Sequence, residues 1–268
     1  MNAGKYVLDV GEIDLHRMTL LGDIYKPYTT LFIEHNGLRG GMHVADVGCG
    51  PGNMSLWFAD QVGTSGSVTA IDSSSEQLNI LKSRLQSKNI THVLPKKLDV
   101  YELSKHFNQQ FDVVYCRFFL IHLQEPVKAI YQLKKILKPN GRLIIAELDN
   151  YTWYSYPENS YLQRDIDLLC QLAKRRGIDL SIGKKLYAHF KALQLNDINI
   201  NIAQPVLMEK EHREYMIFKI QTWGKKYLEH QLINQNEFEE LLNNFKALAL
   251  NEEYLLLGAR MFQIAGTN

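Results

Sequence analysis

Apolar and polar positions change periodicity several times between residues 43 and 147. Short, nearly continuous apolar runs are typical of strands buried on both faces, and stripes with a helical spacing follow these runs. The pattern predicts strands at 43–47, 67–71, 91–95, 111–116 and 142–147, and helices at 53–62, 74–88, 102–107 and 125–138. This alternation favours an α/β fold with a doubly wound, mostly parallel sheet, in which ligands bind at the carboxyl ends of the strands.

The segments before residue 43 and after residue 147 show a different pattern of apolar and polar residues. Residues 12–36 carry a helical apolar stripe that Pro27 interrupts, which predicts either a kink or two short helices. After Glu147, an aromatic cluster at 151–156 leads into a mainly helical region. Its helices are expected at 158–176, 183–194, 209–232 and 234–248, and its strands at 197–203 and 254–264. The strand at 197–203 alternates polar and apolar residues, which suits the edge of a sheet.

Three alternate glycines, Gly48, Gly50 and Gly52, stand between the first predicted strand and the helix after it. Glycines there let the backbone approach a ligand closely and adopt dihedral angles that a Cβ disfavours. Asp72 closes the next strand, where a carboxylate is placed to accept hydrogen bonds from the hydroxyls of a ribose. A dinucleotide fingerprint would need its third glycine one step further on, where this chain has Asn53. The sequence thus predicts a cofactor with an adenosine-like unit.

Five motifs occur in register with the predicted strands. They are Asp46-Val47-Gly48-Cys49-Gly50-Pro51-Gly52, Ala70-Ile71-Asp72, Leu98-Asp99-Val100, Phe111-Asp112-Val113-Val114 and Leu137-Lys138-Pro139-Asn140-Gly141-Arg142-Leu143-Ile144-Ile145. Over about residues 40–150, this set resembles the class I S-adenosylmethionine-dependent methyltransferases, in the branch similar to ubiquinone/menaquinone biosynthesis methyltransferases. The resemblance implies S-adenosyl-L-methionine as cofactor and a seven-stranded sheet of order 3-2-1-4-5-7-6 with the final strand antiparallel.

The same resemblance suggests how the chain is divided. A single methyltransferase domain is expected over residues 1–268, with N-terminal helices at about 12–36 and a cofactor-binding core at about 40–150. Helices within about 151–195 and 209–248 would form a cap over the core, and the terminal strands at 197–203 and 254–264 would complete the sheet.

The resemblance assigns cofactor contacts to residues at the ends of successive strands. These are Asp46, Gly48 and Gly50 around the methionine portion, Asp72, Ser73 and Gln77 beside the ribose and adenosine, Asp99 and Val100 at the adenine, and Arg117 and Phe118 at the front of the cofactor. Asn53, directly after the glycines, is also expected to bind the cofactor. Tyr25 and Tyr28, on a helix before the first strand, are expected to cover the methionine end, and packing as core aromatics is the alternative.

Methyl transfer from a sulfonium is an in-line displacement, so the protein mainly has to align the nucleophile, the methyl carbon and the sulfur. A general base is needed only where the acceptor must lose a proton. His122 is the candidate base, and a structural histidine bonded to the backbone is the alternative. Glu147 is the second catalytic candidate, and both Glu147 and Asp149 are expected to face the site. No metal is expected, because Asp149-Asn150 supplies only half of the magnesium pattern of catechol-type relatives and the segment 115–117 has no acid.

The aromatic cluster at 151–156 and the helices at 158–176 and 209–248 are the expected cover over the acceptor. Aromatic faces suit a planar or apolar acceptor and stabilise a sulfonium charge, and ordinary packing within the cap is the alternative. The helices at 209–248 also offer a surface for a homodimer.

Composition narrows the choice of partners. The 268 residues carry 30 Lys and Arg against 29 Asp and Glu, so no net field draws the chain toward nucleic acid or an anionic membrane. The three cysteines are far apart in sequence, which argues against a zinc site or a disulfide framework and favours the cytoplasm. The first five residues lack the apolar core of a signal peptide, and no apolar run reaches the roughly 18 residues of a membrane span.

The leading hypothesis is an S-adenosylmethionine-dependent methyltransferase that acts on a small molecule. A nicotinamide-dependent oxidoreductase is one alternative, and the missing third glycine counts against it. A non-catalytic protein that binds the cofactor or a partner is another, because catalysis in this family depends on geometry rather than on one indispensable side chain. A macromolecular acceptor, RNA or protein, is the last, and the near-zero net charge counts against it.

Overall fold

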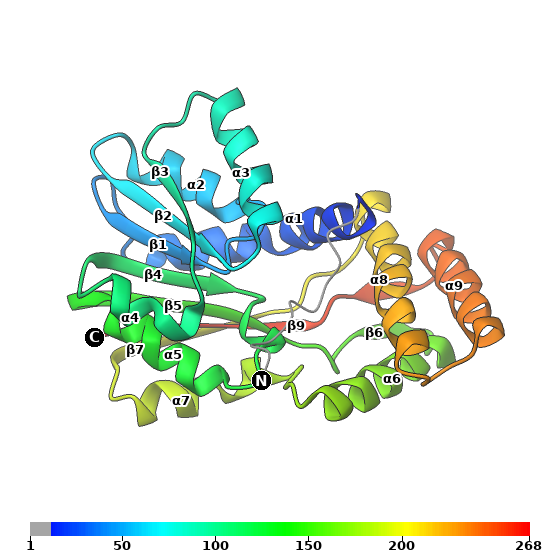
Figure 1. The fold of residues 1–268 in the computed structure, drawn as a ribbon. Coiled ribbons are helices and arrows are strands. Elements are labelled where there is room, and N and C mark those ends of the chain that lie inside the picture. The colour runs from blue at the N-terminus through cyan, green and yellow to red at the C-terminus, as the bar shows by residue number, and fades with distance from the viewer. Residues whose placement is uncertain (1–11) are drawn as a thin grey trace.

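The computed structural model describes residues 12–268, and within this range the main sheet has seven strands in the order β3-β2-β1-β4-β5-β9-β7 (Figure 1). The strands are β1 (His43–Val47), β2 (Ser67–Asp72), β3 (Val93–Lys97), β4 (Phe111–Arg117), β5 (Leu137–Asp149), β7 (Asn196–Ala203) and β9 (Arg260–Thr267). The final strand, β9, runs antiparallel to both of its neighbours, and the other pairings are parallel. The expected strand order and the antiparallel final strand are confirmed.

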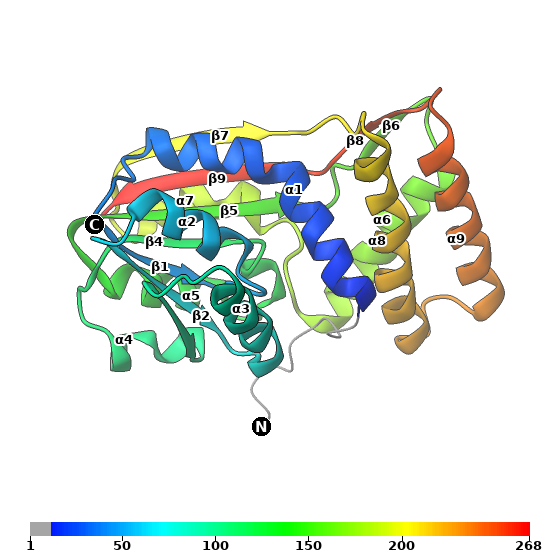
Figure 2. The ribbon, with the colours of Figure 1, turned by 90° about the horizontal axis from the view of Figure 1, so that it is seen from above.

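Helices cover both faces of this sheet (Figures 1 and 2). One face carries α1 (Glu12–His35), α2 (Asn53–Val62) and α3 (Ser75–Ser87), and the other carries α4 (Leu103–His106), α5 (Pro126–Lys135) and α7 (Leu186–Ala192). Alternate residues of a strand point to opposite faces. Val44 of β1 therefore joins the core cluster that contains Phe58 of α2, whereas Ala45 joins the cluster that contains Ile130 of α5.

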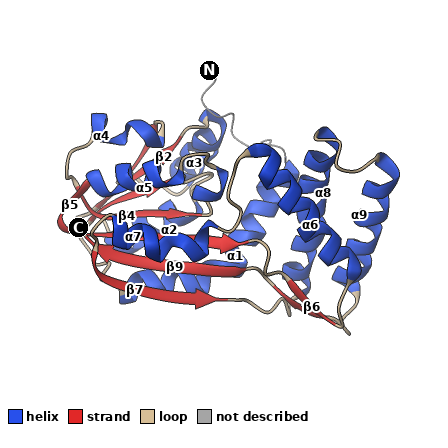
Figure 3. Ribbon diagram, turned by 90° about the horizontal axis from the view of Figure 1, so that it is seen from below, coloured by secondary structure: helices blue, strands red, loops and turns tan. Residues whose placement is uncertain are grey.

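Three further helices stand together beyond the carboxyl ends of the parallel strands: α6 (Ser160–Arg176), α8 (Lys210–Glu229) and α9 (Gln235–Leu250) (Figure 3). Asn159 begins α6, where its side chain accepts two backbone N–H groups, and Gly177 ends it in the left-handed conformation. A capping box of Asn234 and Glu237 begins α9. Between residues 12 and 268, no helix has the length and apolar character needed to cross a membrane.

The helix α1 connects the sheet to these three helices. It is one continuous helix with Pro27 inside it, so the alternative of two short helices is wrong. Figure 2 shows that α1 bends part-way along its length, as expected for a helix that contains proline. The hydroxyl of Thr29 donates to the carbonyl of Tyr25, and that of Thr30 donates to the carbonyl of Pro27. Two threonine hydroxyls thus donate hydrogen bonds to backbone carbonyls of α1 close to the proline.

The predicted strand at 254–264 is wrong as a single element. The chain first forms β8 (Leu255–Leu257), which pairs with β6 (Tyr154–Tyr156) in a separate two-stranded sheet, and only then enters β9. At the break, the hydroxyl of Tyr25 donates a 2.6 Å hydrogen bond to the carbonyl of Ala259. This contact between α1 and the last segment of the chain has no local sequence signal. The division of the chain into one domain with a cap stays a prediction.

Candidate active site

The loop between β1 and α2 lies at the carboxyl end of the sheet. The amides of Gly48 and Cys49 donate to the carbonyl of Ile71 on β2, at 2.8 and 3.0 Å, and so hold the start of the loop. Gly48 and Gly50 have φ angles of 70° and 54°. A Cβ at Gly48 would lie 2.4 Å from the ring of Phe119, whereas a Cβ at Gly50 would meet no atom within 4 Å. The backbone at Gly50 therefore borders open space that a ligand can occupy.

Asp72, at the end of β2, is tied to this loop. Its carboxylate accepts hydrogen bonds from the amide of Gly50 at 2.9 Å and from the amide of Ser74 at 2.8 Å. Burial raises the pKa of Asp72, although these amides act in the opposite direction. Ser73 is exposed, while Gln77 is buried with an Oε1 that meets no donor within residues 12–268. Asp72 and Gln77 thus place acceptor oxygens beside the end of β2.

Asp99 and Val100 follow β3. The exposed carboxylate of Asp99 caps the short 3-10 helix Val100–Glu102, and Val100 is buried. Neither residue lines the cavity described next. Their assignment to the adenine stays a prediction.

A cavity beside the glycine loop has an empty volume of about 880 Å³, part of which is continuous with solvent. Its walls come from α1, the glycine loop, the ends of β4 and β5, and α8. The predicted site residues among its lining are Asp46, Gly48, Gly50, Asn53, Arg117, Phe118 and His122. The predicted residues outside the lining are Tyr25, Asp72, Ser73, Gln77, Asp99, Val100 and Glu147.

Polar side chains gather at the loop end of the cavity. Asp46 is buried and accepts a 2.5 Å hydrogen bond from the hydroxyl of Ser55. Burial raises the pKa of Asp46 to about 6, although the hydrogen bond from Ser55 and the charge of Arg117 oppose the shift. Arg117 also donates to the hydroxyl of Thr29 on α1, at 3.3 Å. One cation and one acid of raised pKa therefore lie close to the glycine loop, beside Asn53.

Tyr25 does not reach the cavity. It is fully buried, its ring packs edge-on against Phe118 with the ring centres 5.3 Å apart, and its hydroxyl is engaged by Ala259. Tyr28 is partly exposed and also lies outside the lining. These positions favour the alternative of core packing for Tyr25 over a direct contact with the cofactor.

His122 ends the short 3-10 helix Leu120–His122, which follows β4, and its side chain lines the cavity. Burial lowers the pKa of His122 to about 3, and the positive charges of Arg17 and Arg176 add to the shift. The imidazole is therefore neutral at physiological pH, but so low a pKa also makes it a weak proton acceptor, because an efficient general base has a pKa near the operating pH.

Glu147 holds this segment from beneath rather than facing the cavity. Its Oε1 accepts the backbone N–H groups of Phe119 and Leu120, at 2.7 and 2.6 Å, while its Oε2 meets no partner within residues 12–268. Burial raises the pKa of Glu147 to about 8, although these amides oppose the shift. The carboxyl group is thus mainly protonated at neutral pH. Its geometry corresponds to a positioning residue for the segment that carries His122, not to the expected contact with reacting atoms.

Glu147 should make stability depend on pH. Because its pKa is raised from 4.5 to about 8 in the folded chain, the folded state keeps a proton that the unfolded state loses between these values. The free energy of unfolding should therefore fall by roughly 1 kcal/mol per pH unit as pH rises through this window. Glu147→Gln keeps an acceptor for the two amides without titrating, so it should remove this part of the slope. Urea unfolding at several pH values tests this, and a variant that retains the full slope would contradict it.

Residues 38–244 match the family model described as a methyltransferase domain. The chain belongs to this methyltransferase family. The matched range includes the glycine loop, the cavity-lining ends of β4 and β5, and α8.

Relatives in the same family agree with the resemblance found in the sequence. The ubiquinone/menaquinone biosynthesis C-methyltransferase UbiE of Teredinibacter turnerae is 29% identical over 167 residues, which cover 62% of this chain and 64% of the relative. UbiE of Azotobacter vinelandii is 30% identical over 155 residues, which cover 58% of each chain. The resemblance to this branch is confirmed, and the chain spans about three-fifths of the length of these relatives.

Solved structures of methyltransferases share the fold. Phosphoethanolamine N-methyltransferase 2 of Haemonchus contortus, solved with phosphomonomethylethanolamine and S-adenosylhomocysteine, has a TM-score of 0.58 and 16% identity over 93% of this chain and 56% of its own. The YcgJ protein of Bacillus subtilis has a TM-score of 0.59 and 17% identity over 89% of this chain and 97% of its own. At such low identity, these similarities establish the methyltransferase fold alone.

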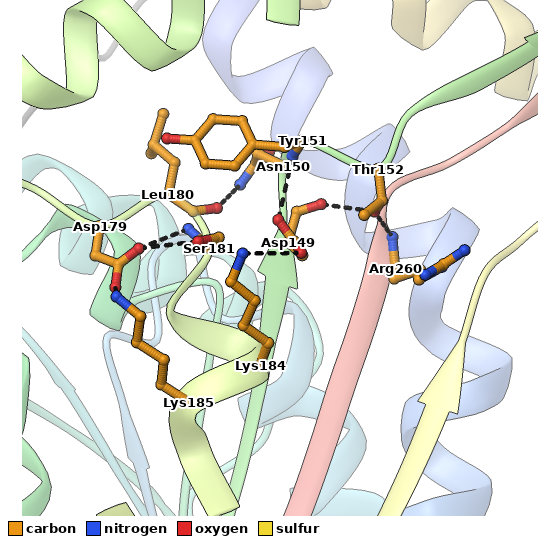
Figure 4. Close-up of polar contacts among 10 residues, drawn as sticks. All are labelled: Asp149, Asn150, Tyr151, Thr152, Asp179, Leu180, Ser181, Lys184, Lys185 and Arg260. Atoms are coloured by element: carbon orange, nitrogen blue, oxygen red, sulfur yellow. Dashed lines mark hydrogen bonds and ion pairs between the residues drawn. The ribbon is translucent and has the colours of Figure 1, made fainter. Parts of the chain in front are cut away.

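The end of β5 is tied to the segment 179–185 (Figure 4). Asp149 forms a 3.7 Å ion pair with Lys184, and the side-chain amide of Asn150 donates to the carbonyl of Leu180 at 3.2 Å. Asn150 lines the cavity and Asp149 does not. Within the described part of the chain, no three residues of His, Cys, Asp or Glu gather closely enough to hold a metal ion.

The wall of the cavity that α1 and α8 form was not predicted from the sequence. This wall consists of Arg17, Met18, Leu21 and Gly22 from α1 with Tyr215 and Trp223 from α8. A usable signal was present, because Asp14, Arg17, Met18 and Leu21 have the i, i+3, i+4, i+7 spacing of one helix face, which places two charged residues on a buried side. Charged residues on a buried face are uncommon unless they are paired or functional.

The aromatic cluster at 151–156 contributes to packing rather than to the cavity. Trp153 stacks on Tyr215 with the ring centres 5.5 Å apart, whereas Tyr154 and Tyr156 are exposed on the small β6–β8 sheet. None of the three lines the cavity. The aromatic residues after β5 that line the cavity are instead Tyr215 and Trp223 of α8.

Proposed function

We propose that this chain transfers a methyl group from S-adenosyl-L-methionine to a small-molecule acceptor by in-line displacement. The observation that carries the proposal is one continuous cavity with two unlike walls. The glycine loop with its polar residues forms one wall, and the helices α1 and α8 form the other. Such a cavity lets a cofactor and an acceptor meet inside a single enclosure, which methyl transfer requires.

The residues of the loop wall, together with Asp72 outside the lining, fit the proposed cofactor. Gly50 presents bare backbone to open space, and Asp72 offers carboxylate oxygens to ribose hydroxyls. Asp46, Asn53 and Arg117 would surround the methionine portion, where Arg117 can pair with its carboxylate. When bound, the cofactor supplies an electrophilic methyl group on a sulfonium. The residues of the chain would orient this methyl group toward the acceptor.

The second wall is the proposed acceptor site. Tyr215, Trp223 and Met18 give it an aromatic and apolar surface, and His122, which lines the same cavity, is the proposed base. A neutral imidazole can take a proton from an acceptor hydroxyl or amine as the new bond forms. The acceptor is therefore expected to be small enough for a partly enclosed cavity, which supports a metabolite over RNA or protein.

We also infer that the protein acts in the cytoplasm without nucleic acid, from its three free cysteines and its formal net charge of +1. A homodimer through the helices at 209–248 remains a proposal, and analytical ultracentrifugation of the purified chain tests it.

Isothermal titration with S-adenosylmethionine, S-adenosylhomocysteine and NADH in parallel tests the proposed function. Binding of the two adenosyl ligands without NADH is the expected result, and a methyl-acceptor screen among small metabolites would follow. Binding of NADH alone would overturn the proposal in favour of an oxidoreductase. The absence of measurable binding for all three ligands would favour a non-catalytic interaction protein.

His122→Gln should slow methyl transfer by about 100-fold while leaving the affinity for S-adenosylhomocysteine nearly unchanged. The glutamine keeps hydrogen-bonding groups at this position but cannot take up a proton at neutral pH. Because the pKa of His122 lies at about 3, the wild-type rate should show no inflection near pH 6.5 from this residue. Single-turnover rates across pH 5–8 would check both statements, and an unchanged rate in the variant would assign His122 a structural role.

A further inference from the structure

Arg17 occupies an unusual position for an arginine. It is only 4% exposed, and it belongs to the cavity wall formed by α1 and α8. Its Nε donates to Asp14 at 3.3 Å, and Asp14 also accepts a 2.8 Å hydrogen bond from the hydroxyl of Thr222 on α8. This network fixes the guanidinium at the junction of the two helices.

The guanidinium is not fully satisfied. Its Nη2 is buried and meets no acceptor within residues 12–268, although the Arg17 side chain also interacts with the hydroxyl of Tyr215 and thereby opposes the rise that burial causes in the pKa of Tyr215. A buried donor without an acceptor costs free energy, and the cost is larger for a charged group. A ligand oxygen in the adjoining cavity would remove this cost, and an anionic oxygen would do so best.

The neighbouring charges leave room for an anion. Two cations of α8 are also buried, and both have partners: Lys219 pairs with Asp165, and Arg213 donates to the carbonyl of Ala249. Neither is part of the cavity lining. His122 is neutral at physiological pH because burial lowers its pKa to about 3. Within the lining, the acid is Asp46, which lies at the loop end beside Arg117. Apart from Asp46, no carboxylate of the cavity lining would therefore repel an anion next to Arg17. Asp14, outside the lining, already accepts a hydrogen bond from the Nε of Arg17.

The surroundings of Arg17 also limit the shape of the ligand. Tyr215 and Trp223 contribute aromatic rings from α8, and Met18 contributes an apolar side chain from the next position on α1. Flat, apolar groups pack well against such side chains. One donor surrounded by aromatic rings suits a carboxylate on a planar body better than a bulky, multiply charged phosphate.

We propose that Arg17 binds an anionic group of the methyl acceptor, and that the acceptor is a planar, aromatic carboxylate held between Arg17, Tyr215 and Trp223. This inference rests on the proposed function, because it names the substrate class for the acceptor side of the same cavity.

The carboxylate of the cofactor's methionine is the competing source of an anion. The structure separates two cations along α1. Arg117 reaches Gly22, where a Cβ would lie 3.6 Å from its Nη2 and 3.3 Å from Asn53 of the glycine loop. Arg17 lies five residues earlier, about 7 Å along the helix axis, next to the aromatic side chains of α8. Arg117 is thus the partner for the methionine carboxylate, and Arg17 is the partner for the acceptor.

The test uses the full chain saturated with S-adenosylhomocysteine, titrated with benzoate and with its neutral analogue benzamide. The wild type should bind benzoate about tenfold more tightly than benzamide, since a charge-assisted hydrogen bond distinguishes the two. Arg17→Gln should abolish this preference while changing the affinity for S-adenosylhomocysteine less than twofold. Lys26→Gln is the matched control, because it removes the same charge from an exposed position of α1 and should leave the preference intact.

Three results would overturn the proposal. The first is equal or absent binding of benzoate and benzamide by the wild-type complex. The second is a preference for benzoate that survives in Arg17→Gln. The third is a large loss of S-adenosylhomocysteine affinity in Arg17→Gln, which would assign Arg17 to the cofactor instead. A wild type that does not bind S-adenosylhomocysteine at all would be a failure of the proposed function, and it is recognised before benzoate is added.

Discussion

Lys219→Met should lower the free energy of unfolding by about 3–5 kcal/mol, because it leaves a buried carboxylate without its counter-charge. Lys219 and Asp165 are almost fully buried and form an ion pair between α8 and α6. Asp165 also accepts a 2.7 Å hydrogen bond from the hydroxyl of Tyr227. The ammonium group lies over the ring of Trp153, 5.3 Å from its centre, so the substitution also removes a cation–π contact. Urea unfolding followed by far-UV circular dichroism measures the loss.

A double variant separates the charge effect from simple loss of packing. Lys219→Met with Asp165→Asn removes both charges and keeps an acceptor for Tyr227, so it should recover a large part of the lost stability. Lys105→Met is the control, because its partner Glu102 and Lys105 itself are exposed, and it should change stability little. Equal losses in the single and double variants would contradict the interpretation of a stranded charge.

Asp72→Ala should weaken the binding of S-adenosylhomocysteine by about 1–3 kcal/mol, which is roughly 5- to 150-fold in Kd. The substitution would remove the proposed acceptor of the ribose hydroxyls. It would also release the amide of Gly50, to which the carboxylate is bonded at 2.9 Å. Asp72 lies outside the cavity lining but holds the amide of Gly50, which lines it, so the loss should appear in affinity and also, to a smaller degree, in stability. Isothermal titration measures the affinity.

Asp112→Asn is the matched control for Asp72. Asp112 is also a strand-end carboxylate that accepts a backbone N–H, from His43 at 2.8 Å, but it lies at the start of β4 and thus at the opposite edge of the sheet. This variant should bind S-adenosylhomocysteine as the wild type does. A folded Asp72→Ala chain with wild-type affinity would show that the carboxylate does not contact the ribose.

Much of the fold could be predicted because its signals are local. Four of the five parallel strands carry a short apolar run, whereas β3, which contains Pro95, Lys96 and Lys97, does not. Gly48 and Gly50 adopt the positive φ angles that glycine tolerates best. Five motifs in one order were enough to indicate the strand order. The departures occurred where a distant partner decides the outcome, as in the division of the last predicted strand beside Tyr25.

The candidate site was predictable to a smaller extent. Its loop wall follows from the motifs, and the structure brings Asp46, Asn53, Arg117 and Phe118 to that wall. Glu147 could not be interpreted from its position in the sequence, because the same strand end can face a ligand or accept the amides of a neighbouring segment. Which of these occurs depends on where the tertiary structure places the segment after β4, whose Phe119 and Leu120 amides bind Glu147.

The sequence by itself determined the parallel sheet, the glycine loop, the acidic residue at the end of β2 and the methyltransferase family. Only the tertiary structure decided that α1 and α8 form the second wall and that Arg17 and Tyr215 lie together there. Backbone conformation and strand burial depend on residues close in sequence, so a pattern can report them. A cavity wall between two helices depends on which faces meet, and no local spacing specifies the partner.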